Sequence, residues 1–92
     1  MPRPPYSVTG VTVLGHYRLR LLFEDGTVGD VDLSHLAQRS GVFEPLKDPD
    51  YFRKVHVDPE GGTVVWPNGA DLAPEMLHEA ARRGGEENLA VV

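Results

Sequence analysis

The fold of this chain is marked most clearly by ten consecutive residues, Trp66-Pro67-Asn68-Gly69-Ala70-Asp71-Leu72-Ala73-Pro74-Glu75. Pro67 has no backbone N–H to donate, so it ends the hydrogen-bond ladder of a strand or lies at a sheet edge. The dipeptide Asn68-Gly69 favours the positive φ angles of a tight reversal. The first half of the stretch therefore predicts the end of a strand followed by a turn.

The second half of the stretch predicts the start of a helix. Pro74 suits the first helical position, and the carboxylate of Glu75 in the first turn complements the helix dipole. Asp71 lies just before this start, where we expect its side chain to accept hydrogen bonds from free backbone N–H groups. The helix is expected to run from Pro74 to about Arg83 and to end at Gly84-Gly85.

Three strands are predicted in the first part of the chain. The segment 17–23 has the clearest period of two, because apolar and polar side chains alternate along it. Gly15-His16 predicts a type II′ hairpin turn before this strand, and Glu24-Asp25-Gly26 predicts a type I′ turn after it. The neighbouring strands then cover about Ser7–Leu14 and Thr27–Leu33.

Short helices and a second hairpin are predicted between these strands and Trp66. Helices are expected over residues 34–39 and, with Asp48 as N-cap, from residue 49 through 54. Strands are expected near 55–57 and 63–66. The order βββα(α)ββα predicts an α+β fold, with a small, mostly antiparallel sheet made of a three-strand meander plus a hairpin. The short helices are expected on one face of that sheet.

Length and composition are those of one small globular domain. The chain has 92 residues, of which 40% are hydrophobic and 25% charged, and these values suit a single core. We predict a flexible arm over residues 1–6, one α+β domain over 7–83 and a flexible tail over 84–92. The absence of cysteine excludes disulfides, thiolate catalysis and cysteine-ligated zinc.

The charge balance disfavours two classes of partner. Fourteen acidic and nine basic residues give a net charge of −5, whereas non-specific nucleic-acid binding draws its affinity from Lys and Arg. Anionic membrane surfaces are disfavoured for the same reason. The start of the sequence shows no signal-peptide pattern, and no stretch is long and apolar enough to cross a membrane. We therefore expect a cytoplasmic, prokaryotic protein.

The reactive side chains match no catalytic or metal-binding pattern. The carboxylates around the second predicted turn do not follow the calcium-loop spacing. No two histidines have the spacing of a helical zinc site: they are His16, His35, His56 and His78. No serine lies in a glycine-flanked elbow, and Gly61-Gly62 precedes a strand rather than a helix. We predict no catalytic, cofactor-binding or metal-binding residues and no enzymatic activity.

The candidate interaction or ligand rim is formed by Trp66, Asn68 and Asp71. Such a rim requires that Trp66 and Asn68 be partly exposed. The other interpretation is structural, because a strand end, a turn and a helix cap account for every residue of the stretch. The sequence also repeats a short pattern, Asp25-Gly26-Thr27-Val28 and Gly61-Gly62-Thr63-Val64. Either duplication or the short menu of turn residues explains this echo.

Several motifs follow one another in a characteristic order: Leu19-x-Leu21-x-Phe23-x-Asp25-Gly26, Val31-Asp32-Leu33, Phe43-x-Pro45-Leu46-x-Asp48, Phe52-x-x-Val55, and Trp66-Pro67-Asn68-Gly69-x-Asp71-Leu72-x-Pro74-Glu75-x-Leu77. In order and spacing they resemble a family of small prokaryotic proteins catalogued as domain of unknown function 2442, over about Val8 to Leu77. The resemblance implies a compact α+β domain like that at the N-terminus of some helix-turn-helix proteins. It also implies genomic pairing with another small protein, in arrangements that look like toxin–antitoxin modules. The family brings no established catalytic residues.

Two functions follow as expectations. The first is a non-enzymatic protein-interaction domain, the antitoxin-like half of a two-protein toxin–antitoxin-type module, whose partner is encoded nearby. The alternative is a small-ligand-binding or regulatory domain with a shallow site near Trp66, Asn68 and Asp71. Exposed edge strands also permit an oligomer of identical chains. Cofactor binding is not expected, because no glycine-rich phosphate loop occurs. Direct nucleic-acid binding is not expected either, because no helix-turn-helix pattern follows Leu77.

Overall fold

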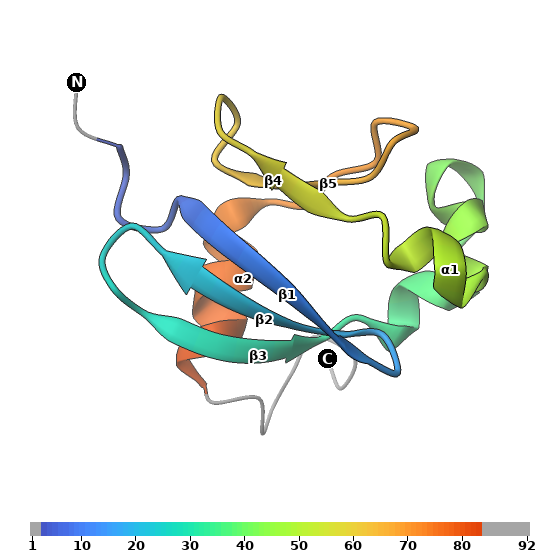
Figure 1. Cartoon of the computed structure of the whole chain (residues 1–92), viewed down its shortest axis with the longest axis horizontal. Helices are drawn as coiled ribbons and strands as arrows, with labels where there is room; N and C mark the ends of the chain where they lie inside the picture. The colour runs from blue at the N-terminus through green and yellow to red at the C-terminus, as the bar shows by residue number, and fades with distance from the viewer. Residues whose placement is uncertain (1–2, 84–92) are drawn as a thin grey trace.

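The computed structural model describes residues 3–83 of the chain (Figure 1). An antiparallel sheet in chain order contains β1 (Val8–Gly15), β2 (Arg18–Phe23) and β3 (Val28–Asp32). A second antiparallel pair contains β4 (His56–Asp58) and β5 (Thr63–Val65). The helical elements are the 3₁₀ helices η1 (Ser34–Gln38) and η2 (Gly41–Lys47) and the α-helices α1 (Pro49–Phe52) and α2 (Pro74–Arg82).

This architecture confirms the predicted α+β fold, with a three-strand meander, a hairpin and short helices. The predicted helix over residues 34–39 is a 3₁₀ helix, and η2 follows it where no helix was predicted. Asp48 caps α1 as predicted, since its carboxylate accepts from the backbone N–H of Asp50 at 3.0 Å. The predicted tail, residues 84–92, lies outside the described residues.

The N-terminal segment, predicted as a flexible arm, contacts the turn between β2 and β3. The carbonyl oxygen of Pro5 accepts from the backbone N–H of Asp25 at 3.3 Å, and that of Pro4 accepts from Ser7 at 3.0 Å. Ser7 in turn accepts from the backbone N–H of Glu24 at 2.8 Å. These bonds attach residues 4–7 to the sheet, while residues 1 and 2 lie outside the described part of the chain.

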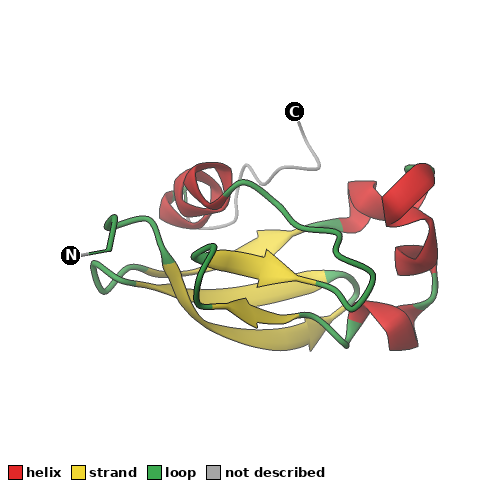
Figure 2. Cartoon of the chain, turned by 90° about the horizontal axis from the view of Figure 1, so that it is seen from above, coloured by secondary structure: helices red, strands yellow, loops and turns green. Residues whose placement is uncertain are grey.

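The two faces of the three-stranded sheet have different surroundings. Helix α2 lies across one face, and η1, η2 and α1 gather at one end of the strands (Figure 2). The β4–β5 hairpin lies beside β1, and the backbone N–H of Val8 donates to the carbonyl of Gly62 at 2.9 Å (Figure 1). The opposite face of the sheet carries no helix among the described residues (Figure 2).

The core fills the space between the sheet and α2 and extends to the short helices. Alternation along β2 buries one of every two side chains, as the sequence predicted. The buried set is Val8, Leu19, Leu21, Phe23, Val31, Leu33, Leu36, Leu46, Phe52, Val55, Val64, Trp66, Ala70, Leu72, Leu77, Ala80 and Ala81. On α2 the side chains of Leu77, Ala80 and Ala81 are buried, whereas Met76 is exposed.

Helix α2 approaches β3 most closely at Gly29. A Cβ atom at this position would overlap the backbone carbonyl and the Cβ of Ala81. The glycine therefore permits the short distance between helix and sheet. Glycine is needed here for space and not for a positive φ angle. Small residues on both sides allow the last turns of α2 to cover the inner face of β3.

The turn between β1 and β2 differs from the prediction. Its two central residues are His16 and Tyr17, with φ of 51° and 61°, and Gly15 is still paired with Arg18 in the sheet. Positive φ at both central residues is the type I′ geometry rather than type II′. The cause is a register irregularity between Val13 and Gly15, which moves the turn along the chain by one residue.

The turn between β2 and β3 also differs from the predicted type I′ geometry. Gly26 has φ of 89°, and it is the only member of Glu24-Asp25-Gly26 with a positive value. The backbone N–H of Gly26 donates to Phe23 at 3.0 Å, and that of Phe23 donates to Thr27 at 2.9 Å. This is a three-residue loop in which a type I turn is followed by a left-handed glycine.

The same loop is built a second time at Trp66-Pro67-Asn68-Gly69-Ala70. Gly69, with φ of 91°, donates to Trp66 at 2.8 Å, and Trp66 donates to Ala70 at 2.9 Å. In both loops the Asx side chain accepts from the backbone N–H two residues later, Asp25 from Thr27 at 2.9 Å and Asn68 from Ala70 at 3.1 Å. The structural echo therefore relates Asp25-Gly26 to Asn68-Gly69 and not to Gly61-Gly62.

Substitution of Gly29 tests the close approach of α2. We expect Gly29→Ala to lower the free energy of unfolding by about 1–3 kcal/mol, because the added methyl group overpacks the contact with Ala81. Gly10→Ala is the matched control, since a Cβ there meets Leu22 at an ordinary 3.5 Å. Urea denaturation of both variants measures the difference. Equal stability of the two variants would contradict the close approach.

Candidate functional site

The predicted rim residues have different environments. Trp66 is 1% exposed, and its indole N–H donates to the backbone carbonyl of Phe52 at 3.0 Å. Asn68 is exposed, but its amide N–H donates to the Val42 carbonyl at 2.9 Å and its amide oxygen accepts from Ala70. The condition for a rim therefore holds for Asn68 and fails for Trp66.

Asp71 is exposed and does not have the predicted capping role. The N-cap of α2 is Ala73, and no side chain makes a capping hydrogen bond there. Asp71 instead forms an isolated antiparallel bridge with Val65, which keeps it in the extended chain that closes the loop after Trp66. Asp71 lies two residues before the N-cap, and its pairing with Val65 keeps the carboxylate away from the first turn of the helix.

Trp66 is the inner end of an aromatic cluster that reaches the surface. The Phe52 ring lies 5.7 Å from the Trp66 ring and 4.9 Å from the Tyr17 ring, measured between centroids. The Tyr17 hydroxyl donates to the backbone carbonyl of Lys47 at 2.7 Å. The cluster of Tyr17, Phe52 and Trp66 therefore connects the β1–β2 turn, α1 and the start of the Trp66 loop.

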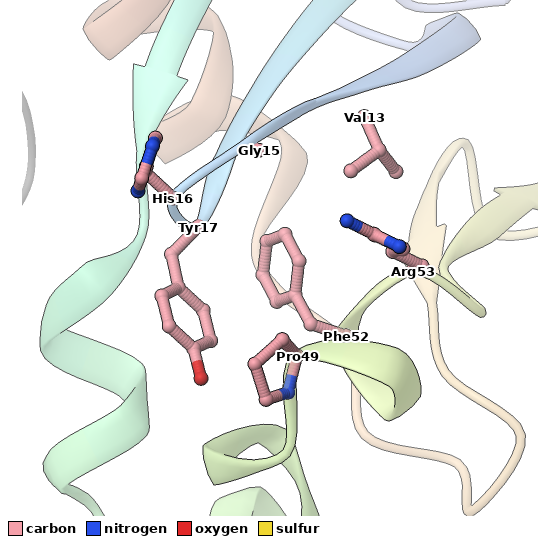
Figure 3. Close-up of a pocket in the computed structure, with 7 residues that line it drawn as sticks. All are labelled: Val13, Gly15, His16, Tyr17, Pro49, Phe52 and Arg53. Carbon is pink, nitrogen blue, oxygen red and sulfur yellow. The ribbon is translucent and has the colours of Figure 1, made fainter.

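A cleft of about 410 Å³ opens at the outer end of this cluster. Its lining comes from the β1–β2 turn and from α1 with the residue after it: Val13, Gly15, His16, Tyr17, Pro49, Phe52 and Arg53. In Figure 3 the Phe52 ring lies between Tyr17 and Pro49 on one side and Val13 and Arg53 on the other. We call this the turn–α1 cleft.

Strained backbone forms one wall of the turn–α1 cleft. Neither His16 nor Tyr17 is a glycine, yet both have positive φ, which costs roughly 1–2 kcal/mol per residue. Tyr17 is held in this conformation by its bond to Lys47, by its contact with Phe52 and by the Leu33 N–H, which donates to its carbonyl at 2.8 Å. Such strain persists only where the surroundings fix it, and it occurs often at functional sites.

The uncovered face of the three-stranded sheet carries ordered rows of side chains. One row crosses all three strands through the paired positions Gly10, Leu22 and Val28. Leu22 and Val28 are 43% and 58% exposed. The next row contains Arg20 and Asp30, and we call these rows together the outer sheet face.

The polar row of the outer sheet face is fixed by a two-pronged ion pair. Arg20 donates to both carboxylate oxygens of Asp30, at 2.8 and 3.2 Å. These bonds raise the pKa of Arg20 and lower that of Asp30. Arg18 lies 3.9 Å from the same carboxylate and remains largely solvated. Arg18 and Arg20 therefore share the carboxylate of Asp30, and Arg18 can still donate to a second carboxylate.

On the covered side, a histidine of α2 binds the β2–β3 turn. The His78 Nε2 lies 2.9 Å from Asp25 Oδ2, and its ring packs edge-on against Phe23 with 4.8 Å between centroids. The Thr27 backbone N–H, then its hydroxyl and then His78 lower the pKa of Asp25 to about 2. The pair attaches the middle of α2 to the sheet.

The described residues contain no group of three or more potential metal-ligating side chains close enough to hold a metal ion. Burial lowers the pKa of His35, whose Nδ1 has no hydrogen-bond partner among the described residues.

No helix within residues 3–83 has the length and apolar character needed to cross a membrane.

Comparison with known proteins identifies the family. The model of a family described as protein of unknown function, DUF2442, matches residues 8–83. The chain belongs to the DUF2442 family. The match runs from the start of β1 to one residue beyond α2, and it confirms the resemblance derived from the motifs. No curated protein and no solved structure matches the chain.

The two surface features of this DUF2442 domain were not found from its sequence. The turn–α1 cleft joins residues 13–17 to residues 49–53, which no local pattern connects. The outer sheet face had a usable indication, because Arg18, Arg20 and Leu22 alternate with the buried side of β2. Leu22 breaks the polar alternation, but a single exposed leucine is common on protein surfaces, and its pairing with Val28 is visible only in the fold.

Asn68 tests whether the Trp66 loop of the DUF2442 domain is structural. We expect Asn68→Ala to lower the free energy of unfolding by about 1–2 kcal/mol, because two hydrogen bonds of about 0.5–1.5 kcal/mol each are lost. Asp71→Ala, in the same segment, should change it by less than about 0.5 kcal/mol. Chemical denaturation measures both values. An equally small effect of the two substitutions would show that the Asn68 bonds contribute little.

Acid stability tests the Asp25 contacts. Since the folded pKa of about 2 lies below the ordinary aspartate value, Asp25 stabilises the fold fully above about pH 4. This contribution is lost as the pH falls through about 2. We expect Asp25→Asn to reduce the slope of unfolding free energy against pH between these values. Parallel curves for the two proteins would contradict the lowered pKa.

Proposed function

We propose that this chain is a non-enzymatic protein-interaction domain, the antitoxin-like partner in a two-protein module of the toxin–antitoxin type. The observation that carries the proposal is the outer sheet face, where Leu22 and Val28 form an exposed apolar pair beside a fixed polar row. We place the protein in the cytoplasm of a prokaryotic cell and infer that its partner is a small protein encoded nearby.

The apolar row supplies the favourable free energy of such an interaction. Leu22 and Val28 are direct cross-strand neighbours, and Gly10 on the other side of Leu22 adds no side chain that would cover it. An apolar side chain of a partner placed over this row removes apolar surface from water at about 25 cal/mol per Å². The row lies on paired strands, which need no rearrangement before binding.

The polar row determines the orientation of a bound partner. Arg20 and Asp30 hold each other in a fixed geometry, so they present a charge pattern with little conformational freedom. Arg18 lies beside them and can pair with a carboxylate of the partner. At longer range the net charge of −5 speeds encounter with a basic protein, and complementary charge raises association rates more than affinity.

The alternative function, a ligand site near Trp66, Asn68 and Asp71, has less support. Trp66 is buried and Asn68 uses both ends of its side-chain amide within the fold. The remaining member, Asp71, is a single exposed carboxylate. These contacts favour the structural interpretation of the Trp66 loop, and the outer sheet face is the better candidate for recognition.

Co-purification tests the proposed interaction. The tagged chain is co-expressed with the product of the neighbouring gene, and the recovered complex is quantified for wild type and Leu22→Glu. We expect at least a tenfold loss for Leu22→Glu, because the charge is desolvated over the apolar row. Met76→Glu is the control, since Met76 is 40% exposed on α2, which covers the other face of the sheet.

Two outcomes would contradict the proposal. In the first, both proteins fold and do not associate. In the second, the complex forms equally well with Leu22→Glu and Met76→Glu, which would move the contact away from the outer sheet face. Recovery of an untagged copy of the chain with the tagged one would instead indicate a homo-oligomer as the interacting species.

A further inference from the structure

The turn–α1 cleft has the size of a site for a small molecule. Its volume of about 410 Å³ lies near the lower end of the roughly 300–1,000 Å³ usual for ligand pockets. The walls nearest to Phe52 are apolar, formed by Val13, Tyr17 and Pro49 (Figure 3). This combination suits a compact ligand body, such as a single ring, better than a nucleotide.

The charge of the lining residues favours a ligand with a negative charge. The seven lining residues include Arg53 and no Asp or Glu, although the whole chain has a net charge of −5. The nearest acid, Asp50, lies 4.0 Å from the Arg53 guanidinium, and the two side chains are 86% and 65% exposed, respectively. An ion pair this exposed is weak, so it leaves the guanidinium able to bind another anion.

The position of Arg53 places the anionic group of the ligand. Arg53 and Val13 lie on one side of the Phe52 ring, while Tyr17 lies on the other and His16 beyond it (Figure 3). A carboxylate paired with Arg53 therefore brings the attached ring against Val13 and the accessible edge of Phe52, which is 2% exposed. Guanidinium binds carboxylate with two parallel hydrogen bonds, which fixes the orientation as well as the distance.

The cleft is held open before a ligand arrives. The positive φ angles of His16 and Tyr17 and the Tyr17–Lys47 hydrogen bond fix one wall. The other wall is α1, which is capped by Asp48 and attached to the core through Phe52. A rigid site loses less entropy on binding than a flexible one.

We propose that the turn–α1 cleft binds a small organic carboxylate with a compact apolar or aromatic body, through Arg53 and the apolar lining around the edge of Phe52. This site is separate from the outer sheet face and from the proposed partner protein. Binding at the cleft changes the contacts of Phe52, whose carbonyl accepts the hydrogen bond of Trp66. The sole tryptophan therefore reports on occupancy from inside the core.

The test uses the indole N–H signal of Trp66 in two-dimensional ¹H–¹⁵N spectra, with benzoate as the probe. We expect benzoate to shift this signal saturably, together with the backbone signals of residues 13–17 and 53. Benzamide has the same shape without the charge, and benzylamine carries the opposite charge. Both should bind at least tenfold more weakly than benzoate.

Two arginine variants localise the effect. Arg53→Gln should weaken benzoate binding about tenfold, because the paired charge is lost. Arg82→Gln is the matched control, since Arg82 is also exposed and also pairs with an acid three residues earlier, Glu79 at 3.1 Å. Because both side chains are exposed, both variants should keep the dispersed spectrum of the folded chain.

Three results would overturn the proposal: no saturable shift with benzoate, equal binding of benzoate and benzamide, or unchanged binding by Arg53→Gln. No partner protein is present in these titrations. Failure here therefore leaves the proposed protein interaction untouched, and failure of co-purification leaves the cleft untouched.

Discussion

The indole N–H of Trp66 donates to the backbone carbonyl of Phe52, and the rings of Trp66, Phe52 and Tyr17 pack in series behind that bond. This contact joins three segments that are far apart in the chain. The helices η1, η2 and α1 are attached to the rest of the fold by this contact, by the Tyr17–Lys47 hydrogen bond and by the buried side chains of Leu36 and Leu46. A buried indole that lost its acceptor would also carry the desolvation cost of an unpaired N–H. The contact therefore fixes where α1 lies against the Trp66 loop.

The turn–α1 cleft and the outer sheet face suit different kinds of ligand. The cleft beside Phe52 is small, lined in part by aromatic side chains and bordered by a cation, which suits a small anion. The outer sheet face carries an exposed apolar row beside one fixed ion pair, which suits a protein surface. A domain of this size has little surface to spare, and these two features lie on different parts of it. The DUF2442 family membership is consistent with either use and decides between neither.

The features predicted correctly from the sequence are those that depend on neighbouring residues. The alternation of β2, the cap of α1 by Asp48 and the proline start of α2 all follow from neighbouring residues, and all three appear in the structure. The turn types were wrong because one glycine serves several loop geometries, and the choice depends on loop length and register. The irregularity between Val13 and Gly15 is such a register effect.

The candidate site was less predictable than the fold. Trp66 is buried because Phe52, 14 residues away, supplies an acceptor, and no pattern within the Trp66 stretch contains that information. The sequence predicted Asp71 as a cap because it does not reveal the bridge to Val65, which keeps Asp71 in the extended chain. The cleft depends on two segments that meet only in the folded chain. Burial and long-range pairing are tertiary properties, so they were outside the reach of motif analysis.

The loop that is built twice, at Phe23–Thr27 and Trp66–Ala70, bears on how the chain finds its register. Each loop is specified by adjacent residues, an aromatic, an Asx side chain and a left-handed glycine, so it can form before distant contacts exist. Hairpins close in roughly 1–10 μs, and a slip of one residue would turn every buried side chain outward. Two such locally determined reversals act as fixed reference points along the chain, from which the long-range aromatic packing can assemble in only one alignment.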